Sequence, residues 1–174
     1  MKKWNIVILS TLLASGAAFA NPFHSSVTEP TNTSPTIPQV GNWDAVIHIY
    51  QSGDHNWSNA NQDGAYASKT DVHQTGDRNS SNAYQSGDRS LTKVVQSGDH
   101  NWSSTTQTGD RSAIDVTQSG DHNSSTVSQS AREAMVLVSQ SGNSNYSNAT
   151  QSYNNSLTVV QQGGNNNSST TWQH

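Results

Sequence analysis

Residues 90–107 read SLTKVVQSGDHNWSSTTQ, and residues 112–129 read SAIDVTQSGDHNSSTVSQ. Both segments keep Ser, Gln, Gly, Asn, Ser and Gln at the same places. The shared pattern, [A/S]-x5-Q-x-G-x-x-N-x-S-x3-Q, occurs six times, at 45–62, 68–85, 90–107, 112–129, 134–151 and 156–173. Internal repetition of this kind predicts a repeat architecture in which each copy folds as one unit.

Each copy contains two strand-sized segments in which alternate residues are restricted. In the copy at 90–107 the restricted positions are Ser90, Thr92, Val94 and Gln96, then Asn101, Ser103, Thr105 and Gln107. Side chains of a strand alternate between its two faces, so the restricted face is predicted to be the interior. One copy cannot bury such a half-polar face alone. Successive copies are therefore expected to stack as an all-β parallel β-solenoid of six strand-turn-strand coils.

Glutamine and asparagine on the predicted interior need hydrogen-bond partners. A side-chain amide can both donate and accept, so identical amides in successive coils can form ladders that satisfy one another. The expected stacking ladders contain Gln51, Asn56, Gln62, Gln74, Asn79, Gln85, Gln96, Asn101, Gln107, Gln118, Asn123, Gln129, Gln140, Asn145, Gln151, Gln162, Asn167 and Gln173. A tight corner needs a positive φ, and the expected turn glycines are Gly53, Gly76, Gly98, Gly120, Gly142 and Gly164.

The composition explains why hydrogen bonding must dominate. Only 30% of the 174 residues are hydrophobic and 11% are charged, the formal net charge is −4, and cysteine is absent. A packed domain usually contains roughly 45–50% apolar residues, whereas disordered chains combine low hydrophobicity with high net charge. The missing cysteine excludes disulfides and thiolate metal sites. The lack of clustered Lys and Arg argues against a nucleic-acid partner.

The chain before the repeats has a different character. Lys2 and Lys3, a short apolar run and an Ala-x-Ala site predict a signal peptide over 1–20, cleaved between Ala20 and Asn21. Residues 21–44 contain all four prolines and are expected to form a flexible leader. We therefore expect an exported chain whose repeat region covers 45–174.

The repeat resembles that of the curlin family, whose consensus is S-x5-Q-x-G-x-x-N-x-A-x3-Q, and the resemblance extends over 45–173. Ser replaces the family's Ala after the Asn in every copy, and Ala replaces the leading Ser at Ala45 and Ala134. Curlins are subunits of curli, the functional amyloid fibres of bacterial biofilms. The resemblance implies a subunit secreted through the periplasm to a cell-surface fibre, or pilus, that serves biofilm formation, adhesion and aggregation. It also implies several partners: a nucleator subunit, an outer-membrane secretion channel addressed by the leader, and periplasmic accessory or chaperone proteins.

The two ends of the predicted stack indicate what the chain does. End coils leave unpaired strand edges, which most β-proteins protect with proline, charge or a covering element. No Asp, Glu, Lys or Arg occurs from 134 to 174. A head-to-tail contact between such ends does not close and gives an open homopolymer. We therefore expect a structural subunit of a curli-like amyloid fibre, resembling the major subunit. The alternatives are a minor subunit that nucleates or anchors the fibre and, more remotely, a calcium- or ice-binding solenoid.

Enzymatic chemistry is not expected. The sequence contains no G-x-S-x-G elbow, phosphate-binding loop or metalloprotease helix, so no catalytic residue, cofactor or metal site is predicted. Three residues share one outward position: Trp57, Trp102 and Tyr146. They could serve adhesion, dye binding or lateral bundling of fibres, or pack as ordinary surface side chains.

Charged residues recur at one corner of the predicted coils. Four aspartates would stack there: Asp54, Asp77, Asp99 and Asp121. Like charges one coil apart repel, so these residues are expected to act as gatekeepers that slow assembly during export. The alternative is that Asp is only a good turn former. Three histidines follow Asp at this corner, and they could bind a transition metal or be solvated turn residues: His55, His100 and His122.

Overall fold

The computed structural model describes residues 45–174, so the predicted signal peptide, its cleavage site at Ala20 and Asn21, and the predicted leader over 21–44 lie outside the described residues. Each coil opens with one strand: β1 (Val46–Ser52), β3 (Lys69–Thr75), β5 (Leu91–Ser97), β7 (Ala113–Ser119), β9 (Met135–Ser141) and β11 (Leu157–Gly163). Each coil closes with a second: β2 (Trp57–Gln62), β4 (Ser80–Gln85), β6 (Trp102–Gln107), β8 (Ser124–Gln129), β10 (Tyr146–Gln151) and β12 (Ser168–Gln173). Coil 1 is thus β1 with β2, and coil 6 is β11 with β12. In this part of the chain no helix could cross a membrane.

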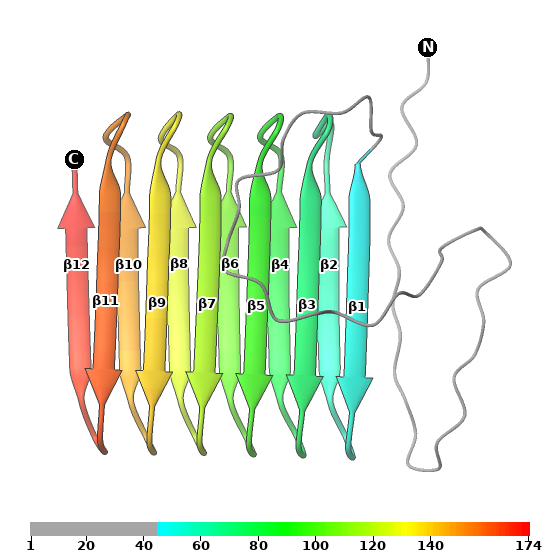
Figure 1. Ribbon diagram of the computed structural model, residues 1–174, viewed down its shortest axis with the longest axis vertical. Helices are drawn as coiled ribbons and strands as arrows, with labels where there is room; N and C mark the ends of the chain where they lie inside the picture. Colours follow the sequence, from blue (N-terminus) through cyan, green and yellow to red (C-terminus); the bar gives the residue numbers. More distant parts are fainter. Residues whose placement is uncertain (1–44) are drawn as a thin grey trace, which may run out of the picture.

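The strands form two six-stranded parallel sheets, in the orders β1-β3-β5-β7-β9-β11 and β12-β10-β8-β6-β4-β2. In Figure 1 the odd-numbered strands form the front layer and run downward, and the even-numbered strands lie behind them and run upward. Each coil therefore contributes one strand to each sheet. We call the two layers the odd sheet and the even sheet. The predicted all-β parallel β-solenoid of six coils is confirmed.

Strand register follows the sequence repeat. Gln74 pairs with Gln96 across β3 and β5, and Gln85 pairs with Gln107 across β4 and β6. A one-residue slip would turn every inward side chain outward, so the alternating pattern fixes this register. Gln51 pairs with Gln74, 23 positions further on, because the link between β2 and β3 is one residue longer than the later links.

The interior between the sheets is half polar. Its apolar part is a thin row of Val, Ala and Ile side chains that includes Val72, Val94, Ile114 and Val116. Its polar part includes eight fully buried glutamines: Gln74, Gln85, Gln96, Gln107, Gln118, Gln129, Gln140 and Gln151. Burial of apolar area stabilises a fold in proportion to that area, and this thin row offers little of it. The coils must therefore also be held together by hydrogen bonds.

The backbones of successive coils approach each other closely at the corner after each odd-numbered strand. Gly98 has a φ of +102°, and a Cβ atom there would lie 2.4 Å from the carbonyl oxygen of Gly120 in the next coil. All six expected turn glycines have a positive φ, between 88° and 102°. No side chain fits at Gly98, and the positive φ disfavours one as well. Glycine is therefore required for backbone contact at this corner.

We expect Gly98→Ala to destabilise the stack much more than Gly64→Ala. Gly64 also has a positive φ, of +67°, but a Cβ atom there would meet nothing within 4 Å. Left-handed backbone strain alone costs about 1–2 kcal/mol, whereas the Gly98 variant must also separate two backbones and should lose about 3 kcal/mol or more. Chemical denaturation followed by circular dichroism measures both variants. Equal losses would contradict the close backbone contact.

Candidate functional site: the stacking ladders and the end coils

Two glutamine ladders run along the stack, one from each sheet. In the odd sheet Gln74 Nε2 donates to Gln96 Oε1 at 2.7 Å, and Gln96 Nε2 donates to Gln118 Oε1 at 2.8 Å. In the even sheet Gln85 Nε2 donates to Gln107 Oε1 at 2.7 Å. The other members are joined in the same way at 2.6–3.3 Å: Gln51, Gln62, Gln129, Gln140, Gln151, Gln162 and Gln173. Every bond runs from one coil to the next, so both ladders have a direction.

The same amides also tie the two sheets together, a role that the sequence analysis missed. Gln96 Nε2 also donates to the Ser80 carbonyl oxygen of the even sheet, at 3.0 Å. Thr92 Oγ1 donates to Gln107 Oε1 at 2.9 Å. The sequence does contain a signal for these cross-sheet bonds. The second inward position of the odd strands, which is Ile or Val in the other coils, is threonine in three of them: Thr70, Thr92 and Thr158. These bonds close a polar network in which buried amides such as Gln96 and Gln107 have partners both along the stack and across it.

Asparagines form a third ladder at the corner after the odd strands. The Asn101 backbone N–H donates to Asn79 Oδ1 at 3.0 Å, and Asn101 Nδ2 donates to the Gly120 carbonyl oxygen at 2.7 Å. Asn101 therefore contacts both the coil before it and the coil after it. Equivalent bonds are made by Asn56, Asn79, Asn123, Asn145 and Asn167.

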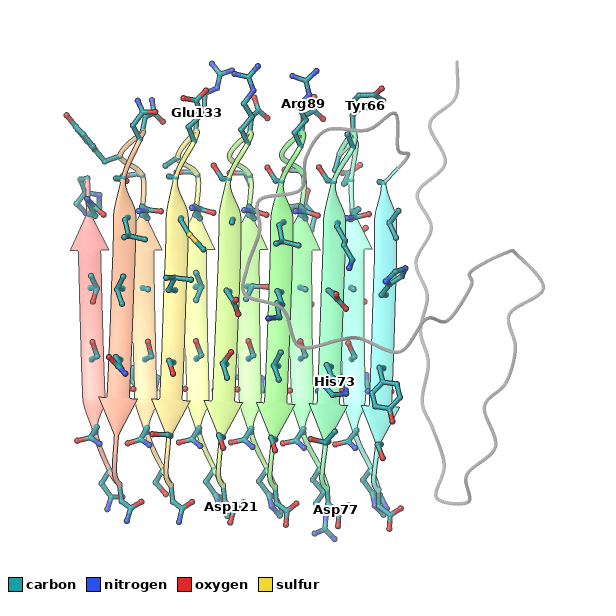
Figure 2. All side chains as sticks on the ribbon, in the orientation of Figure 1. Tyr66, His73, Asp77, Arg89, Asp121 and Glu133 are labelled. Carbon is teal, nitrogen blue, oxygen red and sulfur yellow. The ribbon has the colours of Figure 1, made fainter. Side chains whose placement is uncertain are left out.

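The four aspartates expected to be gatekeepers lie at the tip of this corner, where Figure 2 labels Asp77 and Asp121. Asp77 Oδ1 accepts the Asp54 backbone N–H at 2.8 Å, and Asp99 Oδ1 accepts the Asp77 N–H at 2.8 Å. Asp121 Oδ1 accepts the Asp99 N–H in the same way. In the last two coils the same bond, at 2.9 and 2.8 Å, is accepted by Asn143 and Asn165. The corner therefore needs an acceptor oxygen, which a neutral amide also supplies.

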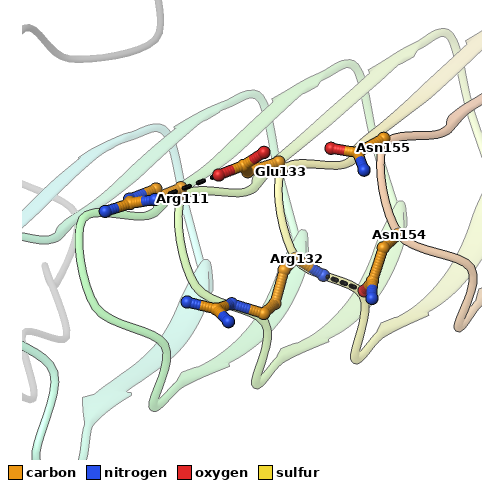
Figure 3. A pocket seen from close by; sticks show the side chains of 5 residues that line it. All are labelled: Arg111, Arg132, Glu133, Asn154 and Asn155. Atoms are coloured by element: carbon orange, nitrogen blue, oxygen red, sulfur yellow. Dashed lines mark hydrogen bonds and ion pairs between the residues drawn. The ribbon is translucent and has the colours of Figure 1, made fainter.

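The opposite corner, after the even strands, carries exposed ion pairs. Arg111 pairs with Glu133 at 3.0 Å, and Arg132 lies 3.7 Å from Asp110. Figure 3 shows that the first pair borders an open pocket, which is also lined by Arg132, Asn154 and Asn155. All four charged side chains are about half exposed, so these pairs add little to stability. The pocket lining contains no nucleophile with an adjacent general base.

The outer face of the odd sheet carries the remaining ion pairs. Lys69 lies 2.8 Å from Asp71, and Lys93 lies 3.6 Å from Asp115. Burial raises the pKa of Asp115, although the Lys93 ammonium opposes this shift. Burial also lowers the pKa of His73, with the Asp71 carboxylate acting in the opposite direction. These groups form a mixed charged surface.

We call the corner after the odd strands, which carries the four aspartates, the Asp corner. Its histidines do not converge on one point. His100 and His122 stack with ring centroids 4.8 Å apart and an interplanar angle of 3°. His55 is separated from them by coil 2, where Arg78 takes the equivalent position. The lone pair of a ring nitrogen lies in the plane of its ring, and these two planes are nearly parallel, so one ion cannot bind both rings unless a ring turns. Within residues 45–174 no group of three or more His, Asp or Glu side chains could hold a metal ion.

One row of buried serines makes no ladder. The hydroxyl groups of Ser81, Ser103, Ser125 and Ser147 have no hydrogen-bond partner. They occupy the position at which the curlin consensus has Ala. A hydroxyl without a partner adds no stability, so this position requires a small side chain and not a polar one.

These features define a class of protein: a repeat protein built as a parallel β-solenoid whose coils are joined by polar ladders. The curlin-associated repeat matches the chain at residues 87–120 and 109–142. Over residues 87–142 the chain is therefore similar to the curlin-associated repeat, which supports a curli-type structural subunit. This similarity is consistent with an extracellular fibre. No curated protein matches the chain.

We expect Gln107→Leu to destabilise the stack strongly. The leucine keeps most of the volume but leaves Gln85 Nε2 and Gln129 Oε1 without their ladder partners. Each buried unpaired group costs about 1–3 kcal/mol, so a total loss of about 3 kcal/mol is expected in chemical denaturation. The matched control is Asn82→Ala, which removes an exposed amide pair with Asn59 and should change stability by less than about 0.5 kcal/mol. If Gln107→Leu left the free energy of unfolding unchanged, the ladders would not be what holds the coils together.

Proposed function

We propose that the chain is the repeating subunit of an extracellular, curli-like amyloid fibre. Coil 6 of one copy stacks on coil 1 of the next, and the fibre contributes to biofilm matrix, adhesion and aggregation. The supporting observation is that the ladders have one direction through all six coils. Such a directional, non-closing contact between unlike ends produces a filament.

The end strands are the least covered parts of the stack. Ile47 and Ile49 on β1 pack against the core but remain partly exposed. On β12 the inward residues Ser169, Thr171 and Gln173 are also partly exposed, whereas their equivalents on β10 are buried. A head-to-tail contact covers both sets at once. The gain in buried interior therefore favours addition of a further copy at either end.

The hydrogen-bond pattern predicts which backbone groups meet at this joint. Met135 N–H donates to the Ser156 carbonyl oxygen of the next coil at 2.9 Å. Leu157 occupies the equivalent position on the last coil, so its N–H group faces the Ala45 carbonyl oxygen of the next copy. One end thus supplies the donor that the other end accepts.

The Asp corner continues across the joint in the same manner. Asn143 N–H donates to Asn165 Oδ1 at 2.8 Å. In a head-to-tail pair the Asn165 N–H faces the Asp54 carboxylate of the next copy. Residues 134–174 contain no charged side chain of Asp, Glu, Lys or Arg, so Asp54 meets no like charge there. The joint is electrostatically easier to form than the contacts between coils 1 to 4.

The assignment to the major subunit rests on regularity, because all six copies keep both Gln positions and the Asn. Thioflavin fluorescence of the purified chain with and without its own seeds tests this assignment. A lag phase that seeds abolish is expected of the major subunit. The alternative is a minor subunit that anchors the fibre, which would form no fibre alone but would shorten the lag of another curlin. A nucleator, an outer-membrane secretion channel and periplasmic chaperones are proposed partners on the curlin resemblance alone.

We expect Leu157→Pro to slow fibre elongation at least tenfold and Leu157→Ala to leave it nearly unchanged. Proline removes the N–H group that the joint needs, while alanine keeps it. Leu157 is 57% exposed, so neither variant opens a cavity in the core. Seeded elongation rates measured by thioflavin fluorescence, with circular dichroism as a check on the fold, distinguish the two. Equal rates would contradict a joint at β11.

Replacement of Asp77, Asp99 and Asp121 by Asn tests the gatekeeper hypothesis. Asn143 and Asn165 already make the corner bond in this chain, so the triple variant keeps the bond and removes three stacked charges. Like-charge repulsion between adjacent strands predicts a shorter lag phase. The reverse variant, Asn143→Asp, should lengthen it. Unchanged lag phases in both directions would favour the alternative, in which Asp serves only the turn.

A further inference from the structure

The outer face of the odd sheet changes character along the stack. Coils 2 to 4 carry the two ion pairs of this face. Coils 5 and 6 instead present four apolar side chains at outward positions: Met135 and Leu137 on β9, and Leu157 and Val159 on β11. The register places Met135 beside Leu157, and Leu137 beside Val159. We call these four residues the apolar block; Figure 1 shows its two strands side by side, at the end of the front layer opposite β1.

The apolar block faces solvent. Leu157 is 57% exposed and Val159 is 56% exposed, and within residues 45–174 every other exposed large hydrophobic side chain is aromatic. A further copy that stacks on coil 6 covers the edge of β11, but it does not cover the outer face of the sheet. The block therefore stays open along a fibre unless another segment of the protein lies over it.

The size of the block indicates what kind of segment fits. It is two strands wide and three residues long, so it presents on the order of 100 Å². A stable contact between separate proteins usually needs about 800 Å² from each partner, so the block cannot hold a free second copy side by side. A segment tethered next to the block needs far less area, because a short linker gives it a high effective concentration.

Such a tethered segment begins at the joint between copies. In a head-to-tail pair, Ala45 of the next copy follows Ser156 of coil 6 in the stack, and the predicted leader of that copy joins the repeats at Ala45. We propose that residues 37–43 of each incoming copy pack across the apolar block of the preceding copy and act as a clasp over the joint. This inference rests on the proposed function, because the joint brings the leader and the block together.

The sequence of this segment matches the block in spacing. Pro35 and Pro38 favour the polyproline II conformation, which has three residues per turn, and every third residue here is apolar: Ile37, Val40 and Trp43. At ~3.1 Å per residue, Trp43 and Val40 lie about 6 and 16 Å from Ala45. On the preceding copy, Leu157 and Leu137 lie about 6 and 14 Å from the same point, by strand spacing and rise. One side of the segment can therefore follow the block.

Charge favours the preceding copy over the leader's own stack. Residues 30–43 contain no charged residue, and neither do coils 5 and 6. On its own stack the segment would instead cover coil 2, where Lys69 lies 2.8 Å from Asp71. Removing water from an ion pair is costly. The uncharged segment therefore suits the uncharged end of its neighbour.

Disulfide trapping tests the contact, because the chain contains no cysteine. Chains with Val40→Cys are assembled together with chains that carry Val159→Cys, and the fibres are then oxidised. The matched control pairs Val40→Cys with Ser128→Cys, an exposed outward position on the even sheet. A double variant with both Val40→Cys and Val159→Cys distinguishes contact with the neighbour from contact within one chain.

The test pair should give at least tenfold more mixed disulfide dimer than the control pair, as identified by mass spectrometry, and the double variant should give linked oligomers. A double variant linked within single chains would overturn the proposal. So would intact fibres in which the test pair links no better than the control. Absence of fibres in electron micrographs would overturn the proposed function as well, whereas fibres without the link would overturn the clasp alone.

Tethering alone brings Val40 near the block, so the strength of the contact is measured separately. A variant with Ile37→Ser, Val40→Ser and Trp43→Ser should release soluble chain from diluted fibres at least fivefold faster than wild type. The control, Phe23→Ser with Val27→Ser, removes apolar leader residues outside the proposed clasp and should release chain at the wild-type rate. The clasp closes after a copy has been added, so seeded elongation should stay within about twofold for both variants. Equal release rates for the two variants would overturn the clasp.

Discussion

Hydrogen bonding between buried side-chain amides of successive coils is the interaction on which this fold depends. A buried amide without a partner is costly, and a single coil offers Gln96 no equivalent amide to bond. Gln74 and Gln118 supply it from the coils on either side. The apolar row between the sheets is too thin to replace these bonds. Coils are therefore stable only as a stack, as in other repeat proteins in which each unit contacts only its neighbours.

The sequence predicts the stack well because one constraint is repeated in every coil. The spacing shared by 90–107 and 112–129 gives the period, and the alternation within each segment gives the inward face, so register follows without further information. The bond from Gln96 to the Ser80 carbonyl was not predictable in this way, because it depends on the distance between the two sheets. The missing partners of the buried serines depend on side-chain rotamers, which a repeat pattern does not contain.

The role of the corner aspartates could be predicted from the sequence only in part. Asp77 Oδ1 accepts a backbone N–H group from the preceding coil, and the sequence already holds a hint of this role in the Asn that replaces Asp in the last two coils. Both residue types share an acceptor oxygen, and only one carries a charge. The sequence suggested two functions for the aspartate side chain, a turn bond and charge repulsion. The geometry establishes the turn bond, and this bond does not require the negative charge, because Asn makes it too. Assembly rate and corner geometry can therefore be changed separately.

The stacking interaction constrains where an individual chain can differ from its relatives. Every inward position must match the next coil, and the last coil must match the first coil of another copy if a fibre is to grow. Outward positions are free of this requirement, because no ladder passes through them. On the odd sheet they carry ion pairs. On the even sheet the outward strand positions are uncharged, and five of them are aromatic. What such a protein binds must therefore be encoded on its outer faces, while its interior encodes only its own continuation.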